Sequence, residues 1–202
     1  MALRLTAPPG RTLVMGVLNV TPDSFSDGGR FDAFDRAMDQ ARVMIAEGAD
    51  ILDVGGESSR PGADPVPEAE ELERVAPVIE ALSRETDLPI SIDSYKPAVA
   101  RECLKLGATI VNDIGGLREP EMIRAAADSG ASVVMMHMRG RPKTMQRDTD
   151  YDNLLGEIRE FFADRIAAAE AAGIEEIVID PGIGFGKTAQ QNFELIRRLD
   201  EL

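Results

Sequence analysis

Carboxylate and amide side chains close several short apolar runs of this sequence. Asp53, Asp93, Asn112 and Asp180 carry the most weight, and each lies in or directly after a run rich in Ile, Leu and Val. A buried carboxylate is costly unless it is paired or hydrogen-bonded, and few Lys or Arg residues lie nearby in the sequence. A heterocyclic ring with adjacent N–H donors would supply the missing partners. We therefore expect a pocket that accepts hydrogen bonds from such a ring.

The segment 14–29 changes at Asn19 from an apolar, β-branched run into a loop of small and polar residues. A buried strand that ends in such a loop is typical of a binding site. The polar residues of the loop are Asn19, Thr21, Asp23, Ser24, Ser26 and Asp27. An ordinary solvated strand-to-helix connection is the alternative, because Thr-Pro-Asp and Asp-Gly-Gly are common turn sequences.

Two further loops are rich in glycine. In G-G-E-S-S-R-P-G at 55–62, Arg60 suits a carboxylate or phosphate, and the alternative is a surface arginine in a mobile loop. The segment 182–188, G-I-G-F-G-K-T, is not a nucleotide-binding loop, since Pro181 and Lys187 occupy positions where those motifs need glycine. It indicates a backbone that approaches a ligand beside Asp180, with chance glycines as the alternative.

His137 follows an apolar run and is a candidate general base. A lone histidine at such a position is more often structural. No serine or cysteine lies in a nucleophile-elbow pattern, so the sequence does not favour a covalent hydrolase.

The elements that would position these residues repeat along the chain. A helical pattern ends at Gly48, Gly107, Gly130 or Gly173, and a short apolar strand follows each glycine. Strands are expected at 13–18, 51–54, 89–92, 110–113, 133–137 and 177–180. This alternation predicts an α/β fold with a parallel sheet. Because polar residues recur at the strand ends, we favour a (β/α)₈ barrel over a doubly wound sheet. About six of its eight units would lie in residues 1–202, as a single and C-terminally incomplete domain.

The composition excludes several kinds of protein. A formal charge of −14 argues against nucleic acid or an anionic membrane as a partner. No apolar run approaches the length of a membrane span. The single cysteine, Cys103, excludes an internal disulfide and fits a reducing cytoplasm, and one Cys with one His rules out a Cys/His zinc site. We expect a cytoplasmic protein whose partners are small molecules.

Six segments together resemble the dihydropteroate synthase family. They run in order over nearly the whole chain: N-V-T-P-D-S-F-S-D-G-G at 19–29, G-G-E-S-S-R-P-G at 55–62, S-I-D-S-Y-K-P at 91–97, V-N-D-I at 111–114, M-H-M-R-G-R-P-K-T-M at 136–145 and D-P-G-I-G-F-G-K at 180–187. The resemblance implies a (β/α)₈ barrel, a homodimer when complete, that serves folate synthesis and is a target of sulfonamides. Its reaction joins a dihydropterin, activated as the hydroxymethyl diphosphate, to p-aminobenzoate.

The resemblance also implies roles for individual residues. Asn19 would contact the Mg²⁺ that accompanies the diphosphate. The pterin and diphosphate would be held by Ser59, Asp93, Asn112, Met136, Asp180 and Phe185, and the p-aminobenzoate pocket would contain Phe25, Ser59, Arg60 and Pro61. Asp27, Ser59 and Arg60 would be the catalytic residues. In this reading the metal and Arg60 stabilise the leaving charge, while the carboxylates favour a developing pterin cation.

Two departures from the family pattern keep other interpretations open. Ser59 stands where the family usually has threonine, which keeps the hydroxyl and loses a methyl group. The sequence has no counterpart of the Ser-Arg-Lys segment on the family's seventh strand, or of the Arg and His on its eighth. The alternatives are a non-catalytic pterin-binding fragment and, ranked lower, a pterin-binding methyltransferase domain of a corrinoid system.

Overall fold

The computed structural model describes residues 5–21, 30–60 and 62–202, and no side chain is described for residues 30–32. Strands and helices alternate strictly along the chain. The strands are β1 (Met15–Asn19), β2 (Ile51–Gly55), β3 (Ile90–Asp93), β4 (Ile110–Asp113), β5 (Ser132–Met136) and β6 (Ile177–Asp180). The helices are α1 (Arg30–Ala46), α2 (Glu68–Glu85), α3 (Pro97–Lys105), α4 (Pro120–Ser129), α5 (Leu154–Ala171) and α6 (Ala189–Arg197), with short 3₁₀ turns η2 (Met145–Arg147) and η3 (Leu199–Glu201).

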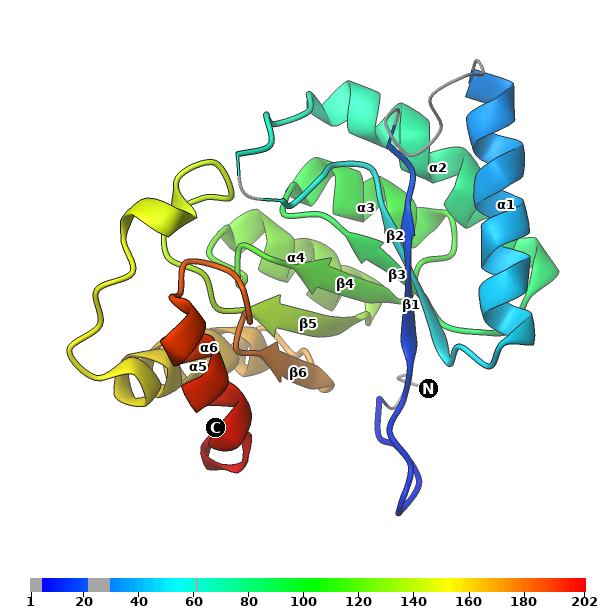
Figure 1. Ribbon diagram of the computed structural model, residues 1–202. Helices are drawn as coiled ribbons and strands as arrows, with labels where there is room; N and C mark the ends of the chain where they lie inside the picture. The colour runs from blue at the N-terminus through cyan, green and yellow to red at the C-terminus, as the bar shows by residue number, and fades with distance from the viewer. Residues whose placement is uncertain (1–4, 22–29, 61) are drawn as a thin grey trace.

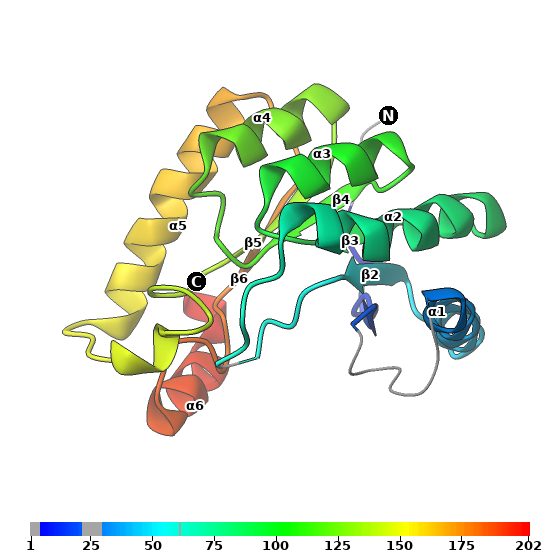
Figure 2. The ribbon, with the colours of Figure 1, turned by 90° about the horizontal axis from the view of Figure 1, so that it is seen from above.

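The strands form one parallel sheet in the order β1-β2-β3-β4-β5-β6. Helices α1 to α5 lie along one side of the curved sheet, and the arc of helices is open between α6 and α1 (Figures 1 and 2). The α/β class and the six βα units are therefore confirmed. None of the helices in the described ranges combines the length and the apolarity that a membrane span requires.

The helix-facing side of the sheet forms the main core. Leu52, Val54, Ile92, Val111 and Met135 are completely buried there. The glycines expected to end helices do so with left-handed φ angles, for example 96° at Gly48 and 63° at Gly130. Since successive strand residues point to opposite faces, the residues between these apolar side chains project into the interior of the curved sheet.

Two of the expected strand ends lie elsewhere. Asp53 is the third residue of β2, not its last, and its side chain is buried on the inner face. His137 follows the end of β5 at Met136 and is buried among aromatic rings. The apolar run that precedes each residue was identified correctly, but the residue at which pairing stops was not.

Candidate functional site

Four inward positions form one row across neighbouring strands. The register pairs Asn19 with Gly55, Gly55 with Asp93, and Asp93 with Asn112. Gly55 has no side chain, and a Cβ atom built there would lie 3.3 Å from Asp93 Oδ2. The glycine therefore leaves space in the row between the Asn19 and Asp93 side chains. Parallel pairing thus brings residues from four strands to one edge of the sheet.

Asp53 orients the Asn112 side chain from one level deeper in the sheet. Asn112 Nδ2 donates to Asp53 Oδ2 at 2.9 Å. Burial raises the pKa of Asp53, and the nearby Ser91 hydroxyl and Asn112 amide offset part of that increase. Because the amide nitrogen is committed to Asp53, the Asn112 carbonyl oxygen is left to accept a hydrogen bond from a ligand.

Asp93 lies among other acidic groups. Burial, followed by the charges of Asp53, Glu71, Asp113 and Glu57, raises the pKa of Asp93 well above its usual value. Within the described ranges, no hydrogen-bond donor or cation is paired with its carboxylate. A ligand with N–H donors would satisfy this group and lower its pKa.

Asp180 ends β6 next to Met136, its register partner on β5. The backbone N–H of Gly182 donates to Asp180 Oδ1 at 2.8 Å, which fixes the carboxylate and leaves Oδ2 available to a ligand. Met136 belongs to a small apolar cluster with Ile114, Met138 and Met145, against which Phe185 and Tyr95 pack. The structure therefore places Met136, Phe185 and Asp180 at neighbouring positions.

Lys187 holds the loop that follows β6. Its buried Nζ atom donates to the carbonyl oxygens of His137 at 3.1 Å, Gly182 at 3.1 Å and Phe185 at 2.9 Å. Burial lowers the pKa of Lys187 to about 8, and Asp180 counteracts this effect. Lys187 therefore links the end of β5 to the loop that follows β6.

His137 is not placed for proton transfer to a ligand. Its ring packs against Phe161 at a centroid distance of 5.1 Å, with Tyr151 at 6.1 Å. Burial and the neighbouring cations Lys187, Arg118 and Arg139 lower the pKa of His137 to about 3. A neutral imidazole enclosed by aromatic rings is structural, which was the favoured interpretation of the sequence.

The β2–α2 loop contains the expected diphosphate and p-aminobenzoate residues. Ser59 is partly exposed and Arg60 is exposed, and the Arg60 carbonyl accepts from the Ala63 N–H at 3.1 Å. Phe25, Asp27 and Pro61, for which roles were also expected, lie outside the described residues.

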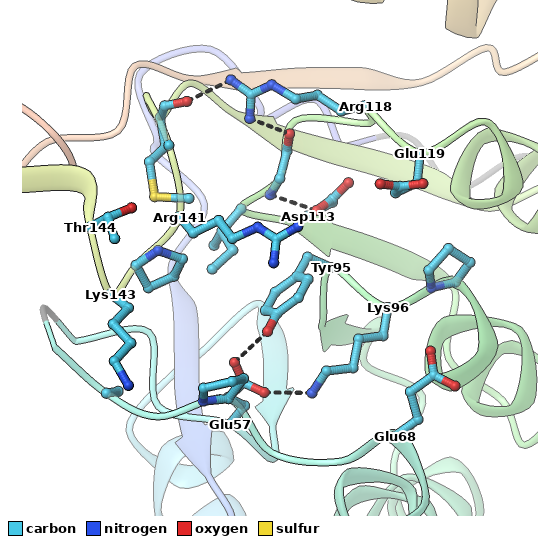
Figure 3. Close-up of a pocket in the computed structure, with 18 residues that line it drawn as sticks. Glu57, Glu68, Tyr95, Lys96, Asp113, Arg118, Glu119, Arg141, Lys143 and Thr144 are labelled. Atoms are coloured by element: carbon cyan, nitrogen blue, oxygen red, sulfur yellow. Dashed lines mark hydrogen bonds and ion pairs between the residues drawn. The ribbon is translucent and has the colours of Figure 1, made fainter. Parts of the chain in front are cut away.

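A cavity of about 640 Å³ opens beside the row of inward residues, among the loops after β2, β3, β4 and β5 (Figure 3). Its wall is charged and includes Glu57, Tyr95, Lys96, Asp113, Arg118 and Arg141. Asp93, Asn112 and Asp180 do not line it. The cavity is therefore a space separate from the surface formed by Asp93, Asn112 and Asp180.

The carboxyl group of Asp113, on the cavity wall, is expected to make the stability of the protein depend on pH. Its carboxylate accepts from the N–H groups of Gly115 and Leu117, but burial raises its pKa to about 6. Between about pH 4 and 6 the folded protein then binds more protons than the unfolded chain, so the free energy of unfolding falls as pH rises, by about 2–3 kcal/mol from this group. Urea unfolding of the unmodified chain and of Asp113→Asn at pH 4.5 and 7 measures this contribution to the free energy of unfolding. A stability difference between the two proteins that does not change with pH would contradict this assignment.

The sequence interpretation did not identify four charged residues that position the loops. Glu57, Glu71 and Lys96 form a buried ion-pair cluster, and Lys187 bridges three carbonyl groups. Glu57 and Glu71 lie 39 and 25 residues from Lys96 in the sequence. An ion pair between residues so far apart leaves no pattern in the local sequence. A lysine directly before Pro97, at a strand-to-helix junction, was the one available signal.

Comparison with known proteins gives consistent results. A family model described as pterin binding enzyme matches residues 15–202. The dihydropteroate synthase of Synechocystis is 53% identical over 95% of this chain and 68% of that protein. The enzyme of Escherichia coli is 51% identical over 93% of this chain and 67% of that protein. The chain thus spans about two thirds of the length of these relatives.

Solved structures with the same fold are also dihydropteroate synthases. The Yersinia pestis enzyme, in complex with a sulfonamide drug, matches with a TM-score of 0.90 and 47% identity, over 100% of this chain and 74% of that one. The Clostridium difficile enzyme, crystallised in the presence of pteroic acid, matches with a TM-score of 0.88 and 49% identity over 95% and 72%. The Xanthomonas albilineans enzyme with 4-aminobenzoic acid gives a TM-score of 0.88 and 47% identity over 96% and 69%.

Proposed function

The chain belongs to the dihydropteroate synthase family of pterin-binding enzymes, and on this basis we propose that it joins a dihydropterin, activated as its hydroxymethyl diphosphate, to p-aminobenzoate. The amine nitrogen of p-aminobenzoate bonds to the methylene carbon, the C–O bond to the diphosphate breaks, and the nitrogen loses one proton. The products are 7,8-dihydropteroate, an intermediate of folate synthesis, and diphosphate. Relatives solved with pteroic acid and with 4-aminobenzoic acid support this choice of substrates.

One observation carries the proposal: three acceptors face the interior, and none has its ligand-facing oxygen committed to a described donor. They are the Asp93 carboxylate, the Asn112 carbonyl, which Asp53 orients, and Asp180 Oδ2. The amino group and ring N–H groups of a pterin match such a set. Met136 and Phe185 add apolar surface for the ring faces. The carboxylates also favour positive charge that develops on the pterin as the diphosphate leaves.

The leaving diphosphate would be met by Arg60 and by Mg²⁺ at Asn19. Asn19 fits such a metal, because its exposed amide lies at the end of β1 in the same row as Asp93. Mg²⁺ usually takes only one or two protein oxygen ligands and completes its shell with substrate phosphates and water. The described residues contain no cluster of three or more His, Cys, Asp or Glu side chains able to hold a metal. When bound, Mg²⁺ would supply neutralisation of the diphosphate charge.

The remaining expectations belong to the same proposal. The protein would act in the cytoplasm on small molecules, without nucleic acid or membrane, and would form a homodimer. Sensitivity to sulfonamides is expected, since a relative with 47% identity was solved with such a drug.

Release of diphosphate tests the proposal directly. The 202-residue chain is incubated with dihydropterin hydroxymethyl diphosphate, p-aminobenzoate and Mg²⁺, and diphosphate and dihydropteroate are measured. Equimolar formation of both products is the expected result, and chelation of Mg²⁺ should abolish it. Binding of the dihydropterin with no product would instead identify a non-catalytic pterin-binding protein.

A further inference from the structure

A buried lysine joins three parts of the chain beside the β2–α2 loop. Lys96 Nζ contacts Glu57 Oε2 at 2.5 Å, the Val66 carbonyl oxygen at 2.6 Å and the Glu71 carboxylate. The Lys96 and Glu71 side chains are 10% and 1% exposed. Figure 3 shows Lys96 and Tyr95 both pointing toward Glu57 across the cavity wall. The three segments are thus connected through one ammonium group.

The contacts fix both ends of the loop. Glu57 stands at its start, and Glu57 Oε2 accepts from the Val66 N–H at 2.8 Å near its end. The Tyr95 hydroxyl donates to Glu57 Oε1 at 2.7 Å. Glu57 and Val66 are therefore bound to each other and to the β3–α3 junction. Residues 58–65, which include Ser59 and Arg60, lie between these two anchored ends.

We propose that Lys96 is a positioning residue, which anchors both ends of the β2–α2 loop and thereby holds Ser59 and Arg60 over the diphosphate and p-aminobenzoate. This proposal rests on the proposed function, since it takes the roles of Ser59 and Arg60 from it. Lys96 itself touches no reacting group; it acts through Glu57 and Val66.

The charge balance of the cluster supports this role. Glu57 and Glu71 are only 11% and 1% exposed, and Lys96 is the cation that pairs with both. The same two carboxylates contribute to the raised pKa of Asp93. Lys96 therefore also compensates negative charge near Asp93. Misplacing a substrate-contacting group by about 1 Å can lower the rate about a hundredfold, so anchoring of a short loop is expected to affect the reaction rate.

The test compares variants that loosen the anchor to different degrees. Tyr95→Phe removes only the hydroxyl bond to Glu57. Lys96→Met/Glu71→Gln removes the ammonium together with one buried carboxylate, which leaves Glu57 with the Tyr95 hydroxyl and the Val66 N–H as donors. The matched control is Lys105→Met on α3, where the lysine is 62% exposed and pairs with Glu102. Hydrogen exchange of the backbone amides and steady-state kinetics are measured for each protein.

For the double variant we expect at least about tenfold faster exchange in residues 57–66, with unchanged exchange in β3 and β4, and kcat/KM for p-aminobenzoate lowered about 10–100-fold. Tyr95→Phe should change both quantities less, and Lys105→Met neither. A uniform rise in exchange over all strands would mean a merely stabilising role and would overturn the proposal. So would faster loop exchange with unchanged kinetics. If the unmodified chain shows no turnover, the proposed function fails. Hydrogen exchange in residues 57–66 then still tests whether Lys96 anchors the loop.

Discussion

Asp93→Asn is expected to weaken binding of dihydropterin hydroxymethyl diphosphate by about 2–5 kcal/mol, or roughly thirtyfold to several thousandfold. The amide cannot take up the negative charge that pairs with the ring donors, and its NH₂ group would face them or displace them. Calorimetric titration in the presence of Mg²⁺ measures the loss. The control is Asp128→Asn on the exposed side of α4.

The same variant should fold at least as well as the unmodified chain. Burial and the neighbouring carboxylates already disfavour the charged form of Asp93, so a neutral side chain of the same size relieves repulsion. Weaker binding combined with an unchanged or higher thermal midpoint would separate recognition from stability. Unchanged affinity would show that the ring does not bind at the row of Asn19, Gly55, Asp93 and Asn112.

Gly182→Ala is expected to destabilise the protein much more than Gly130→Ala. Both glycines have left-handed φ angles, 71° and 63°. A Cβ atom at Gly182 would lie 2.1 Å from the carbonyl oxygen of His137, whereas nothing lies within 4 Å of one at Gly130. Alanine at Gly130 carries only the conformational cost of about 1–2 kcal/mol. At Gly182 the loop must also move away from β5, which adds about 2 kcal/mol or more.

Urea unfolding of the two alanine variants isolates the steric part of the cost, because the backbone penalty is nearly the same in both. The Gly182 variant should also lose activity, since moving this loop shifts Asp180, whose Oδ1 accepts from the Gly182 N–H, and Phe185. Equal stability losses in the two variants would mean that the loop relaxes freely and does not hold the site.

Much of the fold could be predicted from the sequence because its signals are local. A continuous apolar run with a glycine before it marks a parallel strand covered by helices, and four of the six strands were found this way, while β1 and β3 were found from their apolar runs alone. Asp93 and Asn112 are register partners and Asp180 ends β6 at the same edge of the sheet, as the rule that parallel strands end at one edge predicts. The placement of Asp53 did not follow, because the apolar run continues beyond it to Gly55.

The contacts that hold the site could not be predicted, since they join residues far apart in sequence. Lys96 binds groups on the β2–α2 loop and on α2, and Lys187 reaches back 50 residues to His137. The carboxylates were expected to lack cationic partners, and this holds for Asp93. No expectation was made for Glu57 and Glu71, whose shared partner Lys96 becomes visible only when β2 and β3 pair.

The strand order also has a consequence for synthesis on the ribosome. Each strand pairs only with strands adjacent in sequence, so no strand must wait for a later one to be inserted between two that already exist. The chain can therefore add its βα units one at a time from the N-terminus. Asp53, Ser91, Asp93 and Asn112 come together once β4 has emerged, whereas Asp180 arrives only with β6. A nascent chain thus assembles the row that contains Asp93 and Asn112 well before Asp180 joins the sheet.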